Sequence, residues 1–117
     1  MKMKVCELRD LIGATVITGE TGLENDIQSG YCCDLLSWVM AHGSAGMAWV
    51  TVQTHMNVIA VATLHEMSCV VIPEGAQMDK EIADKAAEEG LAVLLSAKPA
   101  YEICGLMYQG GIIAGEE

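Results

Sequence analysis

The chain has 117 residues, of which 52% are apolar and 19% charged, with a formal net charge of −10. This length suits one domain around one hydrophobic core, and the composition is that of a globular rather than a disordered protein. Six Lys and Arg against sixteen Asp and Glu would repel nucleic acid and anionic membranes, so we expect neither as a partner. No apolar run reaches the roughly 18 residues of a membrane span and no secretory signal is evident, so we expect a cytoplasmic protein.

The amino-terminal third predicts one helix and two strands. Apolar residues at helical spacing predict a helix over 5–12, with Gly13 as its stop. The β-branched segment 14–18 predicts a strand, and 27–33 predicts a second. Asp34 then stands where an N-cap is expected, before a helix over 35–43.

The middle of the chain predicts a strand, a helix and a strand. The apolar run 47–52 is typical of a strand covered on both faces. A helix over 58–67 would be capped by Thr54 or Asn57, although its β-branched content would also tolerate a strand. Segment 69–73 predicts the next strand, which ends at Pro73.

The last third continues the alternation. We expect a helix over 79–89 with Asp79 as cap and Gly90 as stop, a strand over 91–95, and a helix over 100–108 with Pro99 early in it. Alternating strands and helices with short connections predict a layered α/β domain, in which a mostly parallel sheet is flanked by helices. We expect one domain over 1–117.

The distribution of charge is uneven along the chain. Between Asp34 and Glu66 there is no Asp, Glu, Lys or Arg. Helices that face water normally carry charge on their outer side, so this stretch is expected to be covered on more than one face. A second copy of the chain in a symmetric homodimer is the commonest cover. The alternative is that these elements are central within the monomer.

A polar block, Gln53-Thr54-His55-Met56-Asn57, separates two apolar elements. In a parallel sheet, ligands tend to bind where a strand leads into a helix, because free helix N–H groups favour phosphate or carboxylate there. His55 would add a hydrogen bond or a switchable charge, and Gln53 and Asn57 would contact a polar ligand edge. The alternative is that Thr54 and Asn57 only cap the helix and His55 is structural.

The sequence lacks the common catalytic and metal motifs. We find no phosphate-binding loop, no dinucleotide fingerprint and no Gly-x-Ser-x-Gly elbow, so we expect no enzyme. There is no Cys-x-x-Cys pair, and five cysteines without a paired framework favour a reducing compartment. We therefore expect buried thiols and no cofactor, with the adjacent Cys32 and Cys33 pointing to opposite faces of a strand.

Segments 34–40, 49–62, 89–96 and 101–106 together resemble a stand-alone DRTGG domain, and the Gln-Thr-His-x-Asn block is their most specific part. A literal Asp-Arg-Thr-Gly-Gly string is absent. The resemblance implies an α/β fold similar to the N-terminal domain of HPr kinase/phosphorylase, a non-catalytic regulatory role, pairing as dimers and, by analogy with modules of larger proteins, nucleotide binding. Single-domain relatives lie among hydrogenase genes of anaerobic bacteria, which implies a redox-enzyme partner.

These observations lead to one main hypothesis and two alternatives. We expect a homodimeric regulatory domain that binds a nucleotide or another anionic metabolite in a polar pocket near the dimer seam. The pocket residues are expected to be Gln53, Thr54, His55 and Asn57, assisted by Asp34 and Ser37. The first alternative is a metal or iron-sulfur accessory protein of anaerobic redox metabolism that uses Cys32, Cys33 and His55. The second is a purely structural partner of a larger enzyme.

Overall fold

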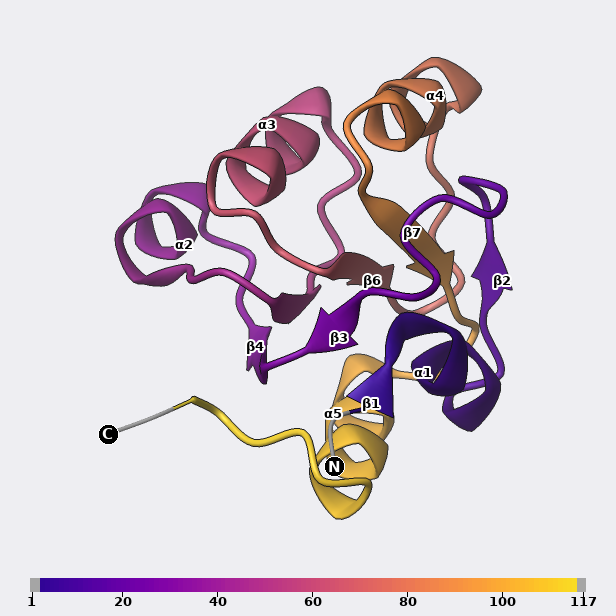
Figure 1. Ribbon diagram of the computed structural model, residues 1–117, viewed down its shortest axis with the longest axis vertical. Helices are drawn as coiled ribbons and strands as arrows, with labels where there is room; N and C mark the ends of the chain where they lie inside the picture. Colours follow the sequence, from indigo (N-terminus) through magenta and orange to yellow (C-terminus); the bar gives the residue numbers. More distant parts are fainter. Residues whose placement is uncertain (1–2, 116–117) are drawn as a thin grey trace.

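Residues 3–115 are described by a computed structural model (Figure 1). Five strands form one sheet in the order β2-β7-β6-β5-β4. Their bounds are β2 Thr15–Val16, β4 Ser29–Cys32, β5 Met47–Val50, β6 Cys69–Ile72 and β7 Ala92–Leu95. Strands β4 to β7 are parallel, and only the short β2 runs antiparallel, beside β7. The predicted α/β fold with a mostly parallel sheet is confirmed.

Helices cover both faces of this sheet (Figure 1). Helices α2 (Leu36–His42), α3 (Met56–Leu64) and α4 (Lys80–Glu88) pack on one face. Helices α1 (Val5–Leu11) and α5 (Ala100–Gln109) pack on the other. A separate antiparallel pair, β1 (Met3–Lys4) with β3 (Asp26–Ile27), lies beside α1.

The sheet is the centre of the core because both of its faces are covered. Every residue of β5 and β6 is buried, which explains why these segments are apolar without alternation. Trp49 faces α2 and α3, and its indole N–H donates to the Cys33 carbonyl at 2.8 Å. Neighbouring side chains such as Val50 and Cys69 face α1 and α5.

Most predicted elements exist, with different bounds. The strand expected over 14–18 is reduced to two residues, and the strand expected over 27–33 is divided between β3 and β4. The β-branched segment after the polar turn is a helix, α3, because its residues pack against the sheet and tertiary burial outweighs local propensity. Gly13 and Gly90 follow α1 and α4 with φ of +62° and +80°, as expected of helix stops.

The predicted caps are partly wrong. The N-cap of α2 is Leu35 rather than Asp34, and α3 is capped by His55 rather than by Thr54 or Asn57. Asp34 does not cap its helix because its carboxylate is bonded to the neighbouring loop after β5. Pro99 occupies the N-cap of α5 and precedes the helix instead of lying within it.

Candidate functional site

The predicted polar residues lie where two neighbouring parallel strands end. Asp34 follows β4, and Gln53 to His55 follow β5, so both loops leave the same edge of the sheet. Each loop then enters a helix on the same face, α2 or α3. The fold thus places Asp34 next to the turn 53–57, as the sequence hypothesis requires.

Asp34 fastens the two loops together. Its Oδ1 accepts from the Thr51 hydroxyl at 2.7 Å and from the Val52 backbone N–H at 2.9 Å. The side-chain amide of Gln53 donates to the Asp34 carbonyl at 3.0 Å, and the Gln53 N–H donates to the Thr51 hydroxyl oxygen at 3.2 Å. Because Thr51 is buried, its hydroxyl needs this acceptor. The turn is therefore held in one conformation by side chains of both loops.

His55 begins α3 and has a defined tautomer. Its Nδ1 accepts from the Asn57 backbone N–H at 3.1 Å. An accepting Nδ1 carries no hydrogen, so the neutral ring carries its proton on Nε2. His55 and the Asn57 side chain are both exposed, which leaves an N–H donor and an amide at the surface beside the N-terminus of α3.

Thr54 and Ser37 complete the predicted set. Thr54 is half-buried within the turn, and Ser37 is exposed in the first turn of α2. Asp34 supplies the single formal charge of the stretch 34–65, whereas the helix N-termini of α2 and α3 contribute partial positive charge at the same edge. This arrangement offers donors for an anion and one carboxylate for a hydroxyl-bearing group.

Exposed apolar side chains surround this site. Of the large hydrophobic residues that the described structure exposes, most belong to α2, α3 and the loops before them. We call this surface the uncharged face: it comprises Leu35, Trp38, Met40, Val52, Met56 and Leu64, which are between 40% and 68% exposed. Trp38 stacks on His42 with ring centroids 4.4 Å apart. Met56 and Leu64 also line a hollow between α3 and α4, together with Lys85 and Glu89.

Of the five cysteines, Cys69 is buried, Cys6, Cys33 and Cys104 are partly buried, and Cys32 is exposed, so the expectation of buried thiols is wrong for most of them. Cys33 packs on the side of α2 and α3, whereas Cys32 shares an apolar hollow with Cys104 of α5 on the other face, so the adjacent pair faces both ways as predicted. Burial raises the pKa of the Cys32 thiol to about 12, with Cys104 nearby as a further cause. Burial alone raises the pKa of Cys69 to about 12. These two groups are thiols rather than thiolates at neutral pH.

The structure does not gather Cys32, Cys33 and His55 into a metal site. Across residues 3–115, no group of three or more His, Cys, Asp or Glu side chains is arranged to hold a metal ion. Within the same range, no helix has the length and apolar character needed to cross a bilayer.

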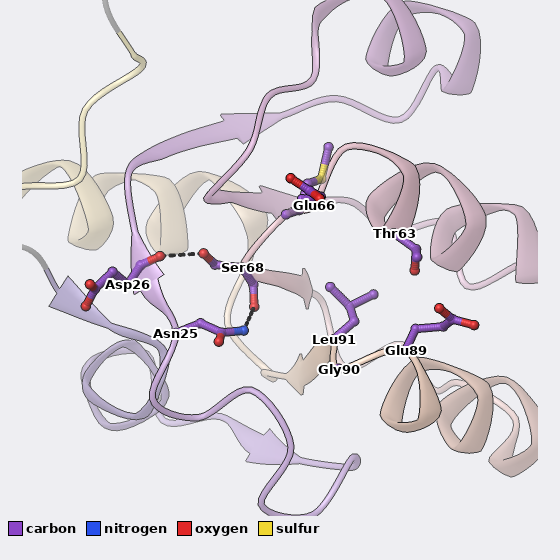
Figure 2. A pocket seen from close by; sticks show the side chains of 9 residues that line it. Asn25, Asp26, Thr63, Glu66, Ser68, Glu89, Gly90 and Leu91 are labelled. Atoms are coloured by element: carbon purple, nitrogen blue, oxygen red, sulfur yellow. Dashed lines mark hydrogen bonds between the residues drawn. The ribbon is translucent and has the colours of Figure 1, made fainter.

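A cavity of about 490 Å³ lies at the opposite end of the sheet (Figure 2). It is bordered by the C-terminal ends of α3 and α4, by Asn25 and by Ser68, whose hydroxyl donates to the Asp26 carbonyl. The hydroxyl oxygen of Thr63 is buried there without a partner. Asp26, Glu66 and Glu89 border the cavity, and of these Asp26 pairs with Lys4 and Glu89 with Lys85. The C-termini of α3 and α4 add partial negative charge. None of the six predicted site residues lines it.

One solved structure with a similar fold contains a DRTGG domain. It is the crystal structure of the CBS and DRTGG domains of the regulatory region of Clostridium perfringens pyrophosphatase, in complex with an activator, diadenosine tetraphosphate. The TM-score is 0.70 at 14% sequence identity, and the match covers 87% of this chain and 44% of that one. The fold is DRTGG-like. Neither the protein-family models nor the curated proteins give a significant match.

Some residues that shape this site could not be identified from the sequence. Thr51 and Val52 read as the end of an apolar strand, yet they hold Asp34 across 17 and 18 positions of sequence. Trp38 is exposed on α2, together with Leu35 and Met40. The one sequence signal that sets this side of α2 apart is the absence of charge around Trp38.

Proposed function

We propose that this chain is a regulatory domain, not an enzyme, which binds a small anionic ligand at the turn 53–57 and works as a homodimer in the cytoplasm. Nucleotides are the leading ligand class. The observation that carries the proposal is the pair of loops at the carboxyl edge of β4 and β5, which Asp34 fastens into one polar surface.

Each predicted residue has a distinct task in this binding mode. The anionic group lies against the N-terminus of α3, where backbone N–H groups and the helix dipole favour negative charge. His55 donates from Nε2 and Asn57 from its amide. The second oxygen of Asp34 accepts from a hydroxyl group of the ligand, as acidic residues do for ribose in other parallel-sheet sites. Gln53, Thr54 and Ser37 border the ligand.

Dimerisation is supported by the chain's charge as well as by its exposed apolar residues. Two copies that each carry a net charge of −10 repel one another over most of their surface. The uncharged face avoids that repulsion and offers apolar area to bury. Since this face includes Leu35, next to Asp34, and Met56, next to His55, a second copy seated on it would border the ligand site.

The neighbouring structure supports the ligand class by analogy. Its regulatory region was crystallised with a dinucleoside tetraphosphate activator. Similar folds do not by themselves share ligands, so the assignment to this chain rests on the turn and its donors.

A thermal-shift panel of nucleotides, phosphorylated metabolites and carboxylates tests the proposal. A ligand at 100 times its Kd stabilises the folded state by about 2.7 kcal/mol, so binding raises the unfolding temperature. We expect at least one compound to do so for the wild type and to lose its effect in the double variant His55→Ala, Asn57→Ala. Gln109→Ala, which changes an exposed amide at the end of α5 on the other face of the sheet, is the control and should respond like the wild type. The proposal fails if every compound shifts the wild type and the double variant equally.

A further inference from the structure

The connections after β6 and β7 leave the sheet in opposite directions. After β4, β5 and β6 the chain crosses to α2, α3 and α4 on one face, whereas after β7 it crosses to α5 on the other (Figure 1). Strands β6 and β7 are parallel neighbours. The two connections therefore diverge at the carboxyl ends of these strands, and in open parallel sheets ligands bind outside the carboxyl ends of the strands. The turn 53–57 is not at this position, because α2 and α3 lie on the same face.

A cavity of about 370 Å³ occupies this position. Gly75 and Gln77 contribute to it from the loop after β6, and Leu95 and Ser96 from the end of β7. Thr15 and Ile17 of the antiparallel edge close its third side. The volume falls within the roughly 300–1,000 Å³ of small-molecule sites.

The walls of this cavity are held by hydrogen bonds between the two diverging loops. The Glu74 N–H donates to the Lys98 carbonyl at 2.9 Å, and the Gly75 N–H donates to the Ser96 carbonyl at 3.0 Å. The Ser96 hydroxyl is buried and donates to the Ile12 carbonyl at 2.9 Å, which fixes the loop to the end of α1. A cavity that is already formed costs little ordering entropy when a ligand enters.

The lining combines apolar sides with a few hydrogen-bonding groups. Ile17 and Leu95 are half-buried and present aliphatic surface. Gln77 uses one amide hydrogen to reach the Gly75 carbonyl at 3.2 Å, and its amide still offers an oxygen and a second hydrogen. Such a side chain recognises a planar edge that has both a donor and an acceptor, like that of a nucleobase.

Lys98 does not line the cavity but lies next to Gly13, which does. The side chain of Lys98 passes over Gly13, where its Cε lies 4.0 Å from the position that a Cβ would take. Its ion pair with Glu102 is long, at 3.6 Å. The N-terminus of α5 is not available to an anion, because the Glu74 carboxylate accepts from the Ala100 N–H at 3.0 Å. An anionic group of a ligand would therefore bind Lys98.

We propose that the cavity between the β6 and β7 connections is a separate binding site for a nucleoside monophosphate. The base lies between Ile17 and Leu95 with its edge on Gln77, and the phosphate pairs with Lys98. The site is independent of the turn 53–57, and its occupant stabilises the contact between the two diverging loops.

The test is an NMR titration of the full ¹⁵N-labelled chain with AMP, adenosine and inorganic phosphate. We expect AMP to move the amide signals of Gly75, Gln77 and Ser96 in a saturable way, and adenosine to do so more weakly. Lys98→Met should weaken AMP about tenfold, the size of a lost charge-assisted contact, and leave adenosine unchanged. Lys85→Met, which removes a lysine in the last turn of α4 that does not line this cavity, should bind AMP like the wild type.

Two further variants separate the outcomes. Gln77→Leu should weaken AMP and adenosine alike, and the His55→Ala, Asn57→Ala variant should leave both unaffected. The inference is overturned if AMP produces no saturable change, if AMP and adenosine bind equally well, or if the signals that move belong to residues 53–57. That last result would support the proposed function while removing the second site.

Discussion

Helices α3 and α4 are each nine residues long and lie side by side on the same face of the sheet, yet their outer surfaces differ. Helix α4 buries Ala83 and Ala86 and carries Lys80, Glu81 and Asp84 among the charges on its exposed side. Helix α3 contains no charged residue and exposes Met56 and Leu64. Helix α4 therefore has the charged outer side that is usual for a helix facing water, whereas the exposed side of α3 is apolar and uncharged.

The largest loss of stability is expected from a change at Trp49, which packs against α2 and α3. Trp49→Ala removes a fully buried indole and leaves the Cys33 carbonyl without its donor, so the free energy of unfolding should fall by about 3–5 kcal/mol. Urea unfolding followed by circular dichroism measures this loss. Trp49→Phe, which keeps an aromatic ring but removes the indole N–H, should lose less stability. Equal losses would mean that the hydrogen bond outweighs the packing.

The next largest loss of stability is expected from a change at Asp34, in the loop before α2. Asp34→Ala leaves the buried Thr51 hydroxyl without an acceptor, which should cost about 1–3 kcal/mol of unfolding free energy. Asp34→Asn keeps an oxygen in place and is the matched control. Chemical denaturation of the three proteins measures the effect, and a variant Asp34→Ala as stable as Asp34→Asn would contradict the role given to this carboxylate.

The proposed dimer contact of α3 is tested by adding charge to its exposed side. Met56→Glu and Leu64→Glu each place a charge on the uncharged face, and we expect each to weaken self-association about tenfold or more, since like charges meet across a symmetric interface. Light scattering over a micromolar concentration series gives the mass. Gln109→Glu adds the same charge on the other face of the sheet and should associate normally. A monomeric wild type would refute dimerisation.

The smallest effect is expected on α4. Lys80→Met removes the exposed ion pair with Asp84, in which the side chains are 87% and 57% exposed. Such pairs contribute less than about 0.5 kcal/mol, so unfolding free energy and association should both stay near the wild type. Urea unfolding at low and high salt measures the effect. A loss above about 1 kcal/mol would show that the stability of α4 depends on its charged side chains.

The elements whose pattern reflects burial could be predicted, whereas the contacts between loops could not. Apolar runs or periodicity predict one structure for each of the segments 69–73, 79–89 and 91–95. The observed elements β6, α4 and β7 match these predictions closely. The cap of α2 was mispredicted because Asp34 bonds to residues 17 and 18 positions away. The strand pair β1 and β3 depends likewise on a long-range contact between two-residue segments, too short for any periodicity.

The candidate site shows the same division. The position of the turn 53–57 follows from strand and helix order, but its cap and its anchor depend on which loops become neighbours in the folded sheet. The cavity between the β6 and β7 connections is harder to predict from the sequence, since its lining comes from three separate parts of the chain. Their convergence depends on the direction in which the chain leaves β7, which no local pattern encodes.

The burial of Cys69 gives the molecule an internal reporter. Its thiol is fully enclosed at the centre of the sheet and stays protonated, whereas Cys6, Cys32, Cys33 and Cys104 all have some access to solvent. A chain in which those four are replaced by alanine or serine would react with a disulfide reagent only while β6 is open. The rate of labelling without denaturant would then measure how often the sheet opens. Any ligand that stabilises the folded sheet would lower that rate.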